Sequence, residues 1–184
     1  EPQPVADAEN RLEGGPVGVD VRKDGDTHGE ATLARAGQDV TLIARGAHLA
    51  SLQQTGLRVE SVHGDFAIQS IEASDDPAEV GIVDLVLVTV KSYDLEQAAE
   101  AARPLLGPTT VVLPLLNGLD AADRLACRLG SQHVLAGLTH ISSSIAEPGL
   151  IRQVSPLRRI TLGEQDGTIS HRAERVRDVL AGSG

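Results

Sequence analysis

The stretch IVDLVLVTV, residues 82–90, is almost continuously apolar and rich in β-branched side chains. A strand that is apolar on both faces must be covered on both sides, which is typical of a central strand in a parallel sheet with helices on each face. Strand-like and helical patterns also alternate on either side of this stretch. We therefore predict an α/β fold built on a doubly wound, mostly parallel sheet.

The neighbouring patterns supply the other elements of this sheet. ATLARAG, residues 31–37, indicates the end of a helix that stops at Gly37. Residues 57–71 alternate around His63-Gly64-Asp65, which predicts an antiparallel hairpin, and a second hairpin is predicted from LIRQV and RITLGE within residues 150–164. Further strands are predicted at 39–44, 109–116 and 133–142, and further helices at 47–56, 94–107, 119–130 and 170–182.

The beginning of the chain has a different character. Residues 1–30 are polar, acidic and glycine-rich without a convincing period, so we divide the chain into an atypical segment, 1–30, and one domain, 31–184. VGVDV (17–21) could form a short strand, but the RKDGDTHGE that follows has no apolar face. The sequence leaves open whether residues 1–30 occupy the position of the first strand. The absence of methionine indicates a processed, cut or mispredicted product.

Charge and composition exclude several classes of partner. The formal net charge of −10 argues against non-specific binding to nucleic acid. No apolar run approaches the roughly 20 residues of a membrane span, and no signal peptide is visible, so we expect no membrane partner. The single cysteine, Cys127, fits a reducing compartment, and we predict a cytoplasmic protein.

Polar side chains follow four of the predicted strands. Arg45 follows residues 39–44, Lys91 follows 82–90, and Asn117-Gly118 follows 109–116. A serine run that includes Ser143 closes the strand predicted at 133–142. Ligands of such sheets bind at the carboxyl ends of the strands. The sequence therefore predicts a ligand site at one edge, with two cations, an amide and small hydroxyl groups.

Arg45 suggests which ligand this is. In dinucleotide-binding folds the second strand ends beside the adenosine ribose, and an arginine there pairs with the 2′-phosphate that distinguishes NADP from NAD. Its planar, permanently charged fork suits phosphate, and Gly46 leaves room for the chain to turn near the ligand. Each residue also has a plainer interpretation: a solvated arginine, a snorkelling Lys91 and a common Asn117-Gly118 turn.

The other polar candidates are weaker. The six histidines have no metal-ligand spacing, so we predict no metal site. Cys127 lies in a predicted amphipathic helix, where a packing role is favoured over that of a nucleophile. The serine run lacks the G-x-S-x-G pattern of α/β-hydrolases.

Three stretches together resemble the N-terminal domain of the ketopantoate reductase (2-dehydropantoate 2-reductase) family. The resemblance runs from about Ala31 to the C-terminus, with ARG, VK-x-YD, LNG and EPG-x-I elements in the family's order. It implies a Rossmann-like domain that binds NADPH for the reduction of ketopantoate to pantoate, on the route to pantothenate and coenzyme A. The stretches are LARAGQDVTLIARGAHLASLQQTGLRVES, DLVLVTVKSYDLEQAAEAARPLLGPTTVVLPLLNGLDAADRL and VLAGLTHISSSIAEPGLIRQ.

The resemblance also implies a role for each candidate residue. Arg45 would bind the 2′-phosphate of the cofactor, and Lys91 would face the cofactor. Asn117 would lie near the nicotinamide and contact the substrate, a small 2-keto acid. Ser143 would line the cofactor cleft.

The chain departs from the family at both ends. The family's G-x-G-x-x-G would place glycines at 21, 23 and 26, where this chain has Val21, Lys23 and Asp26, and GGPVG (14–18) lies about eight residues too early. A frame-shifted or mis-spliced beginning is one hypothesis, which sequencing of the coding region tests. The family's catalytic lysine lies in a helical C-terminal domain that no residue here matches. We therefore assign no catalytic residue and expect this chain alone to be inactive.

Alternative functions stay open at this point. The protein could reduce another 2-keto acid, or it could be a non-catalytic nucleotide-binding or interaction module, because a fold does not fix a function. A truncated product without function is a further alternative. Exposed apolar strands and an absent partner domain would favour association, and a homodimer is one such assembly.

Overall fold

The computed structural model describes residues 17–20 and 28–182. Its main sheet has five parallel strands in the order β5-β2-β1-β6-β7. The chain leaves β1 toward β2 and later returns to add β6 on the other side of β1, so the predicted doubly wound sheet is confirmed. The strands are β1 (Val17–Asp20), β2 (Val40–Ile43), β5 (Glu72–Ser74), β6 (Leu85–Val88) and β7 (Val111–Pro114).

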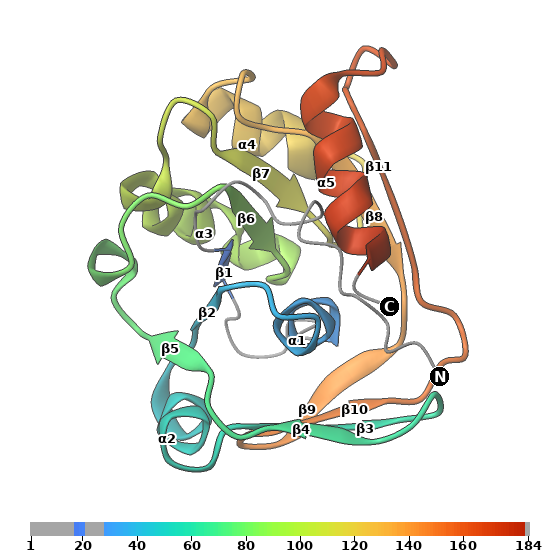
Figure 1. Cartoon of the computed structure of the whole chain (residues 1–184). Coiled ribbons are helices and arrows are strands. Elements are labelled where there is room, and N and C mark those ends of the chain that lie inside the picture. Colours follow the sequence, from blue (N-terminus) through green and yellow to red (C-terminus); the bar gives the residue numbers. More distant parts are fainter. Residues whose placement is uncertain (1–16, 21–27, 183–184) are drawn as a thin grey trace, which may run out of the picture.

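Helices cover both faces of this sheet (Figure 1). Two apolar clusters divide its side chains: Leu85 and Leu87 of β6 belong to one, and Val86 and Val88 belong to the other. This alternation follows from the two-residue period of a strand, and it explains why residues 82–90 are apolar on both faces. The first face carries α1 (His28–Arg35) and α5 (His171–Gly182), and the second carries α3 (Leu95–Ala102) and α4 (Ala121–Leu129). None of the helices in the described part of the chain combines the length and apolar character that crossing a bilayer requires.

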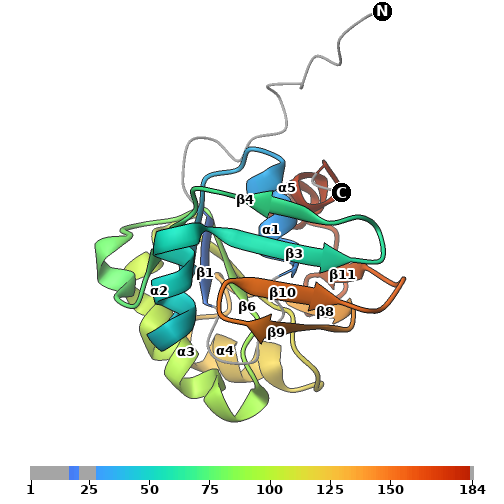
Figure 2. The ribbon, with the colours of Figure 1, turned by 90° about the horizontal axis from the view of Figure 1, so that it is seen from below.

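A second, four-stranded sheet lies beside the first (Figure 2), with the order β4-β3-β10-β9. Its β3–β4 hairpin, which turns at residues 62–65, confirms the first predicted hairpin. Its strands are β3 (Leu57–Ser61), β4 (Phe66–Ile68), β9 (Ser143–Glu147) and β10 (Leu150–Gln153), and α2 (Gly46–Thr55) leads into it.

The pairing predicted for the second hairpin is wrong. β10 pairs antiparallel with β9 and parallel with β3. The segment predicted to pair with it is β11 (Arg159–Gly163), which instead pairs antiparallel with β8 (Ala136–His140). The reason is a tight turn at Pro148-Gly149, where Gly149 has φ +76 and reverses the chain between β9 and β10.

Residues 17–20 form the short strand that the sequence left open. VGVD forms β1, which pairs with β2 on one side and β6 on the other, and so occupies the centre of the sheet. Helix α1 follows it, beginning at His28. The residues that stand at the expected glycine positions, 21, 23 and 26, lie outside the described part of the chain. The division at residue 30 stays a prediction.

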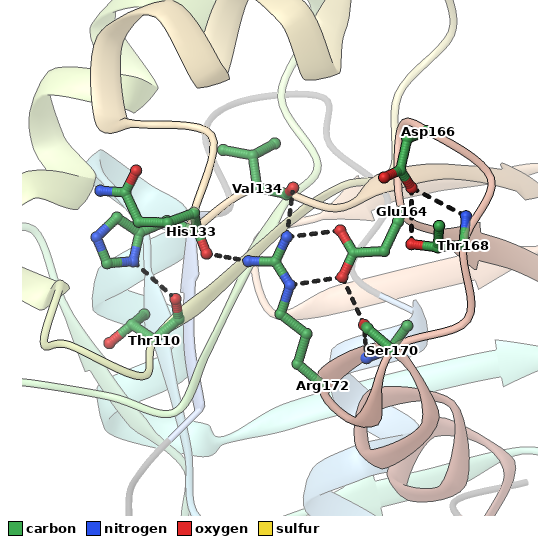
Figure 3. Close-up of polar contacts among 10 residues, drawn as sticks. Thr110, His133, Val134, Glu164, Asp166, Thr168, Ser170 and Arg172 are labelled. Carbon is green, nitrogen blue, oxygen red and sulfur yellow. Dashed lines mark hydrogen bonds and ion pairs between the residues drawn. The ribbon is translucent and has the colours of Figure 1, made fainter.

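Helix α5 is fixed to the domain by an ion pair, shown in Figure 3. Arg172 Nε and Nη2 donate to the two carboxylate oxygens of Glu164 at 2.7 and 2.6 Å, and Nη1 donates to the carbonyl of Gln132. Hydrogen bonds from Arg172 hold the pKa of Glu164 below its usual value, against the opposing effect of burial. The paired side chains therefore tie α5 to the segment that enters β8.

Candidate functional site

Three of the four predicted site residues line one hollow at the carboxyl ends of β6 and β7. These residues are Lys91, Asn117 and Ser143. Lys91 follows β6 after two residues and Asn117 follows β7 after two, so the parallel strands deliver both side chains to the same edge. Ser143 reaches this edge differently from the prediction. It does not close the strand predicted at 133–142, because β8 ends at His140 and Ser143 is the first residue of β9.

Lys91 and Asn117 are exposed and stand on short turns. Lys91 has extended backbone angles, φ −71 and ψ 150, and precedes a 3₁₀ turn at residues 92–94. Asn117 lies between β7 and α4 and is followed by Gly118. Within residues 17–20 and 28–182, neither the ammonium group of Lys91 nor the amide of Asn117 makes a hydrogen bond or an ion pair. Both side chains are therefore available to a ligand.

Arg124 of α4 fixes the turn that carries Lys91. Its Nη2 donates to the carbonyl of Ser92 at 3.0 Å and to Glu96 of α3 at 2.6 Å. The hydrogen bond from Arg124 lowers the pKa of Glu96, and the same bond raises the pKa of Arg124. Exposed ion pairs contribute little to stability, so the consequence of this contact is orientation of the turn.

Arg45 occupies the edge at the end of β2 and is not among the residues that line this hollow. It precedes α2 in an extended conformation, φ −140 and ψ 159, and its carbonyl accepts a hydrogen bond from Leu49 N–H at 3.4 Å. Its guanidinium is exposed and has no hydrogen bond or ion pair among the described residues. β2 and β6 are separated by β1, so the backbones of the two strands that precede Arg45 and Lys91 lie roughly 10 Å apart.

Sequence reasoning missed two threonines of the site. Thr89 and Thr139 line the hollow with Lys91, and they also line an adjoining one that reaches His28 and Glu30 of α1. Thr89 directly follows β6, so its position at the end of a buried strand was a usable signal. Thr139 lies in a strand whose partner, β11, could not be identified from the sequence pattern.

The described residues include no arrangement typical of metal chemistry. No group of three or more His, Cys, Asp or Glu side chains in this part of the chain is placed to hold a metal ion. Cys127 is exposed on α4. The donor set of the hollow, an ammonium, an amide and hydroxyl groups, suits an organic anion with several hydrogen-bonding groups.

Comparison with known proteins gives consistent matches. The family model described as ketopantoate reductase PanE/ApbA matches residues 29–167. The chain is 30% identical over 175 residues to a 2-dehydropantoate 2-reductase of Mesorhizobium japonicum, covering 84% of this chain and 53% of that protein. The chain spans about half the length of the curated relatives it matches.

Solved structures match over a larger share of the chain. A 2-dehydropantoate 2-reductase from Porphyromonas gingivalis W83 superposes with a TM-score of 0.83 at 34% identity, covering 92% of this chain and 61% of that one. The 2-dehydropantoate 2-reductase from Geobacter metallireducens GS-15 also has a TM-score of 0.83, at 30% identity, covering 91% and 56%.

Proposed function

Because the chain belongs to the ketopantoate reductase PanE/ApbA family, we propose that it supplies the NADPH-binding part of an enzyme that reduces 2-dehydropantoate to (R)-pantoate. The observation that carries the proposal is that Arg45, Lys91 and Asn117 follow β2, β6 and β7 at the carboxyl edge of the main sheet. Ser143, the first residue of β9, lines the same hollow as Lys91 and Asn117. Ligands of doubly wound sheets bind at this edge, where the strand order reverses.

Each residue has a part in holding the cofactor and substrate. Arg45 presents a permanently charged fork to the 2′-phosphate of NADPH, at the end of the second strand. Lys91 and Ser143 line the other part of the cleft, and Asn117 offers an amide to the nicotinamide end and to the substrate. Bound NADPH supplies the hydride that reduces the C2 ketone, and the protein supplies position and orientation.

The described residues do not provide a proton donor that we would assign. Reduction of a ketone forms an alkoxide, which a positioned acid must protonate. Lys91 is an exposed residue at the cofactor edge, and we do not give it this role. We therefore expect a chain of these 184 residues to bind NADPH without turning over 2-dehydropantoate.

The test is a comparison of NADPH and NADH binding by the wild type and Arg45→Ala, followed by nucleotide fluorescence. A lost charge-assisted hydrogen bond costs about 1.5–3 kcal/mol, so NADPH should bind roughly ten- to a hundred-fold more weakly to the variant, with little change for NADH. Arg175→Ala is the matched control, because Arg175 is an exposed arginine of α5 that lines none of these hollows. Equal weakening by both variants, or no NADPH preference in the wild type, would contradict the proposal.

A further inference from the structure

The turn between β9 and β10 docks against α2, far from it in sequence. Gly149 N–H donates to Nδ1 of His48 at 3.1 Å, and Ser51 Oγ donates to the carbonyl of Pro148 at 3.0 Å. The carbonyl of Gly149 accepts from Arg58 N–H at 2.8 Å. Both of the side chains in these contacts belong to α2, so the turn holds one face of that helix.

The docking is close, and it favours a glycine. Gly149 has φ +76, and a Cβ added there would lie 2.3 Å from Ser51 Oγ and 3.3 Å from the carbonyl oxygen of Gly56. A side chain at this position would require Ser51 Oγ to rotate and would adopt a strained backbone conformation, so glycine favours this contact between the turn and α2.

His48 makes its bond as a neutral acceptor. Because Gly149 N–H is the donor, Nδ1 of His48 must be unprotonated, which places the ring proton on Nε2. Nε2 is buried and has no hydrogen-bond partner in the described part of the chain. Burial lowers the pKa of His48, which favours the same neutral form.

His48 lies in the first turn of α2, three residues after Arg45. Arg45 forms the N-terminal boundary of this helix, and its carbonyl bonds to Leu49 N–H in the same turn. Gly46 and Ala47 are exposed, whereas Leu49 packs against the core and His48 bonds to Gly149, so both of these side chains hold the turn to the rest of the protein. A shift of the first turn would therefore move Arg45.

The other end of the same hairpin reaches the hollow. β9 begins at Ser143, which lines the hollow with Lys91, and it ends at the turn that docks on α2. One strand thus connects the part of the cleft around Lys91 with the helix that follows Arg45.

We propose that His48 is a positioning residue for nucleotide selectivity: by accepting the Gly149 N–H, it fixes the first turn of α2 and with it the Arg45 guanidinium. This inference rests on the proposed function of Arg45 as the 2′-phosphate ligand. It assigns His48 no contact with the cofactor. Its effect is on the preference for NADPH over NADH, and not on nucleotide binding as such.

The test compares two substitutions of His48. His48→Leu places an apolar side chain in this half-buried position and removes the acceptor, whereas His48→Asn places an amide oxygen near the position of Nδ1. The control is Gln53→Ala, which removes a different hydrogen bond of α2, from Gln53 Nε2 to the carbonyl of Ala73 at 3.0 Å, nearer the C-terminal end of the helix. The ratio of the NADH and NADPH dissociation constants is measured for each chain, with thermal unfolding in parallel.

We expect His48→Leu to reduce the preference for NADPH roughly five-fold, the equivalent of one hydrogen bond. His48→Asn and Gln53→Ala should stay within about two-fold of the wild type, a difference small on the scale of one hydrogen bond. In an Arg45→Ala background, His48→Leu should have no further effect on the ratio.

Other outcomes overturn the inference in distinguishable ways. If His48→Leu lowers the unfolding temperature but leaves the ratio unchanged, His48 is only structural and the proposed function stands. An equal loss in His48→Asn would show that the acceptor is not the cause. A wild-type chain with no preference for NADPH would overturn both the inference and the proposed function.

Discussion

Replacing Gly56 with alanine tests how tightly the end of α2 packs against the β4 segment. Gly56 ends α2 with φ +77 and ψ −160, a backbone region that is essentially restricted to glycine. A Cβ added there would lie 2.1 Å from the carbonyl oxygen of Ile68 and 2.9 Å from two backbone atoms of Gln69. Because these neighbours are backbone atoms, a change of side-chain rotamer cannot relieve the overlap.

Two costs combine in Gly56→Ala. The disfavoured backbone conformation costs about 1–3 kcal/mol, and overpacking costs about 1–3 kcal/mol more. The free energy of unfolding should therefore fall by about 2–6 kcal/mol, which lowers the unfolding temperature of a chain of this size by roughly 4–24 °C. Thermal unfolding followed by circular dichroism measures this fall, and urea unfolding measures the free energy directly.

Gly81→Ala is the matched control. Gly81 has nearly the same φ, +79, but a Cβ added there would meet nothing within 4 Å. Gly81→Ala should lower the free energy of unfolding only by the backbone cost of about 1–2 kcal/mol. If Gly56→Ala destabilised the protein no more than Gly81→Ala, the reasoning from close backbone packing would be refuted.

Two further substitutions probe buried polar contacts. Thr110→Val should lower the free energy of unfolding by about 1–3 kcal/mol, because the buried Thr110 Oγ1 accepts from Gly107 N–H at 2.8 Å and donates to the carbonyl of Val83 at 2.6 Å. If urea unfolding gave the variant the same free energy of unfolding as the wild type, the two hydrogen bonds would not contribute to stability. Glu164→Gln should be less stable than the wild type at pH 7 by about 1–3 kcal/mol, because it removes the charge that pairs with Arg172. The pKa of Glu164 is lowered in the folded state, so the extra stability of the wild type over the variant is fully present above the unfolded pKa. This difference in stability should shrink as the pH falls below about 4.5 and through the folded pKa. A difference between the two chains that stayed constant down to pH 3 would contradict the ion-pair argument.

Helix boundaries show how local sequence effects limit prediction. The helix predicted at 94–107 is α3 over residues 95–102, flanked by 3₁₀ turns at 92–94 and 103–105. Pro104 lies in the second of these turns, and proline has no N–H to continue an α-helix. The presence of the helix was predicted correctly, whereas its ends depended on single residues and on the Arg124 contact to the carbonyl of Ser92.

The candidate site was predictable in part. The sequence placed Arg45, Lys91 and Asn117 at one edge because each directly follows a predicted parallel strand, and the strands do bring their carboxyl ends to one edge. Their binding roles stay predictions. Thr139 and the contact between His48 and Gly149 were not found. They depend on pairings across dozens of residues, and no local pattern encodes such pairings.

The sequence by itself determined the class of fold and the faces of its elements. An almost continuously apolar run, as in residues 82–90, predicts burial on both sides, and a period of two or 3.6 indicates which side chains face the core. Only the tertiary structure decided the partners. VGVD is the central strand, because both β2 and β6 pair with it. β10 pairs with β3 and β9, and not with β11, because the turn at Gly149 and its contact with α2 favour that arrangement. The physical reason is that periodicity specifies which face of a strand is buried, whereas its hydrogen-bonding edges are nearly alike in every strand and are matched only when the chain packs.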